Sequence, residues 1–149
     1  METIYFYSHR EEPYGAFSNF SHHGFTLDGK YWPTSEHYFQ GQKFAGTEHE
    51  EAVRLAPAPK IAADMGRDRN RPLRPDWNEV KEDVMRAALR AKFAAHPDLA
   101  ALLLSTGEEE IVENAPGDYY WGVGKDGSGK NRLGVLLMEL RAELRAELR

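Results

Sequence analysis

A carboxylate, an amide and an amine follow one another at helical spacing in residues 34–45. Glu36, Gln40 and Lys43 are four and then three positions apart, so on an α-helix they share one face. Thr34 or Ser35 can cap this helix, and the helix dipole favours an ionised Glu36 in the first turn. A solvated polar face would have the same spacing. The aromatic neighbours favour partly dry surroundings and acid–base chemistry instead; they are Trp32, Tyr38 and Phe39.

A second candidate lies in residues 118–131, which combine a carboxylate, aromatic rings, flexible glycines and a Lys-Asn pair. Asp118 precedes Trp121, while Lys130 and Asn131 stand at the predicted start of a helix, where backbone N–H groups bind anions. The spacing is not that of a Walker loop, because no Ser or Thr follows Lys130. A surface loop with core aromatics would have the same composition, so both interpretations stay open.

The third candidate is a basic run that ends before a tryptophan. Its cations are Arg67, Arg69, Arg71 and Arg74, and the tryptophan is Trp77. Arginine matches phosphate with two parallel donors, and an indole can stack on a base. Taken alone, the run is better explained as a solvated loop with Trp77 in the core.

Composition excludes several classes of protein. The chain has 149 residues, of which 41% are hydrophobic, and we expect one domain over residues 1–149. A net charge of −5 is atypical of a general nucleic-acid binder. The absence of cysteine excludes thiolate catalysis, and the six histidines form no HExxH pattern, so we expect no metal site. Without a signal-like start or a long apolar run, we expect a cytoplasmic protein with no membrane partner.

Hydrophobic periodicity and turn residues predict more helices than strands. Strands are expected at 3–7 and 111–112, and a hairpin at 25–32 turns at Asp28-Gly29, a favoured type I′ pair. Helices are expected at 34–45, closed by Gly46, at 48–55, at 60–65, closed by Gly66, and at 76–93, 97–104 and 131–149. The predicted class is helix-rich α+β, with a small sheet or hairpin packed among several helices.

Taken together, these segments resemble the NADAR, or YbiA-like, family. The matching stretches are 17–20 (FSNF), 32–40 (WPTSEHYFQ), 42–44 (QKF), 62–67, Trp77, 89–93 (LRAKF), 120–122 (YWG) and 129–134 (GKNRLG). The resemblance runs in order from about Ile4 to Arg141 and is closest to the stand-alone bacterial members. It implies the family's own helix-rich fold and N-glycosidase chemistry without a metal or organic cofactor.

The resemblance implies one of two substrates, either a small molecule or a modified base of a nucleic acid. One group of family members hydrolyses ribosylamino-pyrimidine phosphates, the early intermediates of riboflavin synthesis, and releases ribose 5-phosphate. The other removes ADP-ribose from modified guanine. Likeness to the bacterial members favours the first substrate, a phosphorylated riboside. The sequence indicates no oligomeric state.

The same resemblance marks Glu36, Lys43, Trp77 and Asp118 as functional positions, and a mechanism that fits these residues assigns the following roles. Glu36 would handle protons and stabilise an oxocarbenium-like state. Asp118 would be its partner or fix the ribose hydroxyls. Lys43 would either bind phosphate or attack a ring-opened sugar as a Schiff-base nucleophile. The expected binding residues are Trp77 and Trp121, which would sandwich the base, and Arg67, Lys130 and Asn131, which would hold phosphate, with Asn19 nearby.

Two other classes compete with an enzyme. A non-catalytic nucleotide or ADP-ribose sensor could use the same pocket, although pure binding needs neither Glu36 nor Lys43. A structural interaction module lacks support, because the sequence has no heptad pattern.

Overall fold

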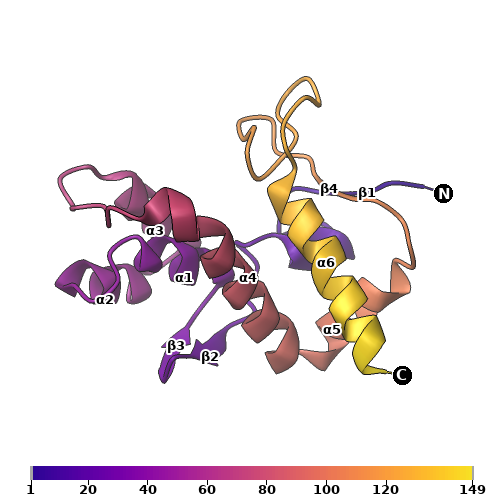
Figure 1. The fold of residues 1–149 in the computed structure, drawn as a ribbon, viewed down its shortest axis with the longest axis horizontal. Helices are drawn as coiled ribbons and strands as arrows, with labels where there is room; N and C mark the ends of the chain where they lie inside the picture. Colours follow the sequence, from indigo (N-terminus) through magenta and orange to yellow (C-terminus); the bar gives the residue numbers. More distant parts are fainter. Residues whose placement is uncertain (1, 149) are drawn as a thin grey trace. The chain divides into compact units, whose positions relative to one another are not determined.

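The computed structural model describes residues 2–148, and the chain divides into two compact units. The central unit covers His22–Ala95, and the terminal unit joins the residues before His22 to those from His96 onward. A single domain over residues 1–149 therefore stays a prediction. The helix-rich α+β class is confirmed by the elements of both units (Figure 1).

The central unit begins with the predicted hairpin. Strand β2 (Phe25–Leu27) pairs antiparallel with β3 (Lys30–Trp32), with Phe25 opposite Trp32. At the turn, Asp28 and Gly29 have φ values of 54° and 79°, the left-handed pair that a type I′ turn requires. The hairpin places the buried Phe25 and Trp32 side chains against Tyr38 and Ala88.

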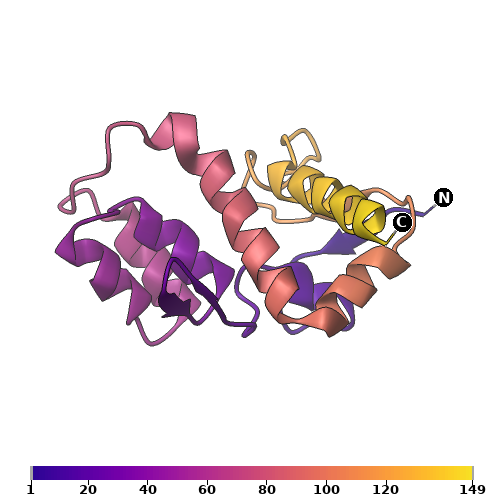
Figure 2. The same ribbon diagram turned by 60° about the horizontal axis from the view of Figure 1, so that its bottom comes forward.

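Four helices complete the central unit: α1 (Ser35–Gln42), α2 (Glu48–Arg54), α3 (Pro59–Arg67) and α4 (Trp77–Ala95). Helix α1 packs against the other three (Figure 2). Thr34 caps it, because the Thr34 hydroxyl accepts a hydrogen bond from the His37 N–H at 3.1 Å. Since α1 touches so many neighbours, most of its side chains are buried.

The predicted helix ends in the central unit were wrong: α2 ends at Arg54 and α4 at Ala95, instead of Leu55 and Phe93. The ends of α1 and α3 differ for identifiable reasons. Helix α1 ends at Gln42 instead of Ala45, because the N–H groups of Lys43 and Phe44 bond back to Gln40 and Gly41 in tighter turns. Lys43 keeps helical angles (φ −57°, ψ −25°) and so stays near the face of Glu36. Helix α3 does not stop before Gly66 but continues to Arg67, so Gly66 does not end the helix.

The terminal unit pairs strands from opposite ends of the sequence. Strand β1 (Ile4–Phe6) lies parallel to β4 (Ile111–Glu113), and a short 3₁₀ helix covers Tyr14–Phe17. Helix α6 (Arg132–Glu147) packs on β4 and on α5 (Pro97–Ser105), as Figures 1 and 2 both show. Within residues 2–148, no helix has the length and apolar content needed to cross a bilayer.

Candidate active site

The predicted site residues fall in both units. The central unit holds Glu36, Lys43, Arg67 and Trp77. The terminal unit holds Asn19, Asp118, Trp121, Lys130 and Asn131.

The polar face of α1 is buried, which rules out a solvated face. Glu36 is 8% exposed and Gln40 5% exposed. The Gln40 amide Nε2 donates to Glu36 Oε2 at 2.7 Å. A hydrogen bond donated to a carboxylate stabilises its ionised form, as does the position of Glu36 in the first turn of α1. The face therefore holds an ordered carboxylate in a mostly dry place.

The amine of Lys43 lies beside two aromatic rings. Its Nζ is 5.8 Å from the centroids of both the Phe39 and the Trp77 ring, which meet edge to face at 5.1 Å. Nζ also donates to the carbonyl of Gly66 at 3.4 Å. Burial, followed by the charge of nearby Arg69, lowers the pKa of Lys43 to about 8, although Glu36 opposes that shift. About a tenth of the amine is then neutral at pH 7.

The cations of the basic run differ in how they are held. Arg69 Nη2 donates to the Gly66 carbonyl at 2.6 Å, and Arg74 pairs with Asp76 at 2.6 Å. Arg71 meets His49 Nδ1 at 2.8 Å. Arg67, in the last turn of α3, is 70% exposed and pairs weakly with Asp64 at 3.5 Å. Arg71 and Arg74 therefore brace the loop, whereas Arg67 is exposed and its contact with phosphate stays a prediction.

Trp77, the first residue of α4, is only 7% exposed. Its ring edge packs on Phe39, so one face of the indole borders the Lys43 amine. Stacking of this ring on a base stays a prediction. The ring lies where it can keep water from one side of the Lys43 amine.

In the terminal unit, Asp118 organises the aromatic loop. Its Oδ1 accepts hydrogen bonds from the N–H groups of Tyr120 at 3.0 Å and Trp121 at 2.8 Å. The Tyr120 ring lies 4.9 Å from that of Trp121 and 5.5 Å from Lys130 Nζ. The carboxylate, the indole and the amine predicted for the site are therefore held in one loop.

Asn131 and Asn19 are both buried, at 7% and 8% exposure. Asn131 Oδ1 accepts from the Glu113 N–H and its Nδ2 donates to the Ile111 carbonyl, both at 2.9 Å. The Asn131 backbone is left-handed (φ 53°) where it opens α6. Its side chain thus ties α6 to β4. Asn19 follows the 3₁₀ helix, in the loop that the family resemblance marks.

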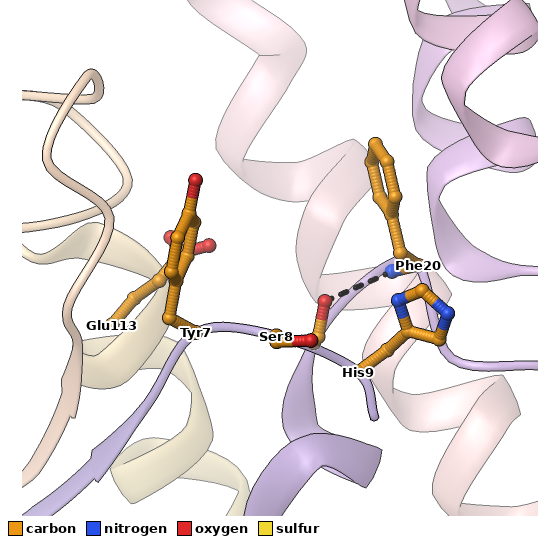
Figure 3. Close-up of a pocket in the computed structure, with 6 residues that line it drawn as sticks. Tyr7, Ser8, His9, Phe20 and Glu113 are labelled. Carbon is orange, nitrogen blue, oxygen red and sulfur yellow. Dashed lines mark hydrogen bonds between the residues drawn. The ribbon is translucent and has the colours of Figure 1, made fainter. Parts of the chain in front are cut away.

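A cavity of about 320 Å³ in the terminal unit was not predicted. It is lined by Tyr7, Ser8, His9, Ser18, Phe20 and Glu113. Figure 3 shows the Tyr7 and Phe20 side chains at opposite sides of the view, with Ser8 and His9 between them and the Glu113 carboxylate beside Tyr7 in this view. The concentration of aromatic residues in 5–20 was the available signal, but its pairing with Glu113 needs the parallel β1–β4 contact.

His37 is a structural residue of the central unit. His37 is 1% exposed, and its ring nitrogens contact Thr34 Oγ1 at 2.8 Å and the Ala56 carbonyl at 3.0 Å. Burial lowers the pKa of His37. No group of three or more His, Asp or Glu side chains in residues 2–148 is placed to hold a metal ion.

Comparison with known proteins identifies the class to which this fold and site belong. The NADAR domain matches residues 5–145. N-glycosidase YbiA of Escherichia coli (strain K12) is 56% identical over 147 residues, which cover 99% of this chain and 92% of that protein. The NMR structure of E. coli YbiA has a TM-score of 0.90 at 55% identity and covers 97% of this chain and 86% of that one. The chain therefore belongs to the NADAR family.

A more distant relative is a longer plant protein. The chloroplastic riboflavin biosynthesis protein PYRR of Zea mays is 43% identical over 146 residues, covering 88% of this chain but 23% of the plant protein. The similarity therefore concerns one part of that protein.

Proposed function

We propose that this NADAR protein hydrolyses the N-glycosidic bond of ribosylamino-pyrimidine 5′-phosphates, the intermediates of riboflavin biosynthesis, and releases ribose 5-phosphate. The chain is an N-glycosidase by its close relationship to proteins of that name. The name of the plant relative supports riboflavin intermediates as substrates. The observation that carries the chemistry is the Lys43 amine, whose pKa is lowered to about 8 beside the buried Glu36.

The proposed reaction uses Lys43 as the nucleophile. A ribosylamine opens to an imine at C1 of the ribose. The neutral amine of Lys43 adds to C1, and the pyrimidine amine leaves with a proton, so that an imine joins Lys43 to the ring-opened sugar. Water then adds to this imine and releases ribose 5-phosphate, which restores the lysine. Glu36 moves the protons between the water, the lysine nitrogen and the leaving amine.

The remaining predicted residues are assigned to binding. Asp118 would contact the ribose hydroxyls, Trp121 would stack on the ring, and Lys130 and Arg67 would supply charge for the phosphate. Asn19 keeps its predicted place beside the substrate. We leave the Asn131 side chain out of this set, because its amide is already bonded to β4 on both sides. We keep cytoplasm as the proposed location.

The test is incubation of the purified chain with 5-amino-6-ribosylaminouracil 5′-phosphate, with assay of free ribose 5-phosphate. ADP-ribosylated guanosine serves as the second substrate, with assay of ADP-ribose. Borohydride added during turnover should trap the sugar on Lys43, seen as a mass increase on the peptide that contains it. Lys43→Arg is the matched control, because it keeps the charge but forms no imine.

Cleavage of the ribosylaminouracil alone supports the proposal. Cleavage of ADP-ribosylated guanosine alone would replace the substrate but keep the chemistry. Tight binding of either compound with no cleavage would make the protein a sensor and overturn the proposal.

A further inference from the structure

Gly66 lies inside helix α3, where glycine is unfavourable by about 0.5–1 kcal/mol relative to alanine. Its backbone does not need a left-handed conformation, since its φ is not positive. A Cβ at this position would instead stand 1.9 Å from Gln40 Oε1 and 2.7 Å from Gln40 Cδ. The missing side chain therefore makes room for the Gln40 amide.

The Gln40 amide is confined on both sides. Its oxygen is buried, has no hydrogen-bond partner and rests against Gly66. Its nitrogen donates to Glu36 Oε2 at 2.7 Å. Leaving the buried Gln40 oxygen without a hydrogen bond costs free energy. In return, the Gln40 N–H group points at the Glu36 carboxylate.

We propose that Gln40 is a positioning residue that holds Glu36 ionised and in one orientation. Gly66, which has no side chain, leaves the space that the Gln40 amide needs to do so. A carboxylate that this hydrogen bond keeps ionised carries no proton and is able to accept one. Glu36 therefore begins the reaction as a base, not as an acid. This inference rests on the proposed function for its catalytic meaning, but the Gln40–Glu36 contact can be tested without substrate.

The charged groups that act on Lys43, beside this pair, are cations apart from Glu36 itself. The cations are Arg67 at the end of α3, Arg69 after it and Lys81 on α4. On α2, Glu50 bonds Gln42 and Glu51 pairs with Lys30 of β3. These cations and the Gln40 hydrogen bond both favour the ionised form of Glu36. The test must therefore separate the effect of the Gln40 amide from that of the charges.

Titration of Glu36 by ¹³C NMR, with the carboxyl resonance assigned through Glu36→Gln, isolates it. Gln40→Met keeps the bulk and removes the donor, and we expect the Glu36 titration to move up by about one pH unit. Gly66→Ala should cause a similar shift by displacing the amide. Gly117→Ala is the matched control, because a Cβ there meets nothing within 4 Å. An unchanged titration in Gln40→Met would overturn the proposal, and this variant suffices if Gly66→Ala does not fold.

A double-mutant cycle tests the role of Gly66. In a Gln40→Ala background the side chain that Gly66 accommodates is gone, so Gly66→Ala should no longer shift the Glu36 titration. A shift of full size in that background would show that Gly66 acts by another route, and would refute its role in making space for the Gln40 amide.

Kinetics on a cleaved substrate supply the second readout. We expect Gln40→Met to lower kcat about tenfold at unchanged KM, with the largest loss at the acidic end of the pH profile, below the rise that Lys43 sets. Wild-type kcat would refute the positioning role even if the titration moved. If no substrate is cleaved, the proposed function fails, while the NMR result still decides the Gln40–Glu36 contact.

Discussion

The amine of Lys43 lies 5.8 Å from the centre of the Trp77 ring, close enough for the indole to exclude water from one side of it. The ring has two opposite effects on the lysine. Its π face favours the charged amine, whereas burial disfavours it. Burial is the largest cause of the lowered pKa, so exclusion of water is the stronger effect.

Trp77→Ala should therefore raise the pKa of Lys43 back toward 10.5 by admitting water. Less neutral amine would remain at pH 7, and kcat/KM should fall about tenfold or more, with the alkaline rise of the pH profile displaced upward. Trp77→Phe is the control, since a smaller ring still covers the amine. A profile that falls in height at every pH without moving would mean that Trp77 acts on substrate binding instead.

The pH dependence of the wild type should reflect Lys43. Because its pKa is lowered to about 8, the neutral nucleophile accumulates as the pH rises through 8. Single-turnover rates should thus climb from pH 6 to 8 and level off above it. Lys43→Arg should reduce turnover by at least about a hundredfold at every pH, and yield no borohydride-trapped product. Trapping at another lysine would reassign the nucleophile.

Glu36→Gln should abolish turnover with little loss of stability. The amide preserves the shape of the side chain on α1 but accepts no proton, so we expect kcat to fall by about 10²–10⁴. Urea unfolding should change by less than about 1 kcal/mol, since an oxygen remains to accept from Gln40. Rates like those of the wild type would remove Glu36 from the mechanism.

Asp118→Asn separates a structural role from a catalytic one. Asparagine retains an Oδ1 that can accept from the Tyr120 and Trp121 N–H groups, so Tm should stay near that of the wild type. Loss of the negative charge should still lower kcat by about tenfold if Asp118 serves the reaction. Asp118→Ala should lower Tm as well. Full activity in the asparagine variant would confine Asp118 to holding the loop.

Lys92 makes stability depend on pH. It is fully buried in α4, and burial lowers its pKa to about 7. Between pH 7 and 10.5 the unfolded chain binds the proton that the folded chain has lost, so stability rises with pH, by at most about 1.4 kcal/mol per unit. Lys92→Met should remove this rise, and should therefore stabilise the fold most at pH 7 or below. Urea unfolding at pH 7 and 10 checks this. The same difference in the free energy of unfolding between the two proteins at both pH values would contradict the assignment.

Local patterns predicted much of the fold because their causes are local. The Asp28-Gly29 turn follows from two positions that need positive φ, and the α1 start follows from the Thr34 cap. The ends of α1 and α3 were mistaken because glycine was interpreted only as a helix terminator. Gly66 is in fact required by a side chain from another helix, which no local pattern reveals.

The sequence by itself determined the family, the helix-rich class and the face that carries Glu36, Gln40 and Lys43, since residue types and spacing are properties of the chain. Only the tertiary structure decided that this face is dry, because α2, α3 and α4 must pack around α1 to exclude water. The same packing lowers the pKa of Lys43 and turns the Gln40 amide toward Glu36. In the terminal unit, the pairing of β1 with β4 brings Tyr7 and Glu113 to one cavity. Burial and long-range contacts arise only when distant segments meet, so the chemistry of these groups is set by the fold.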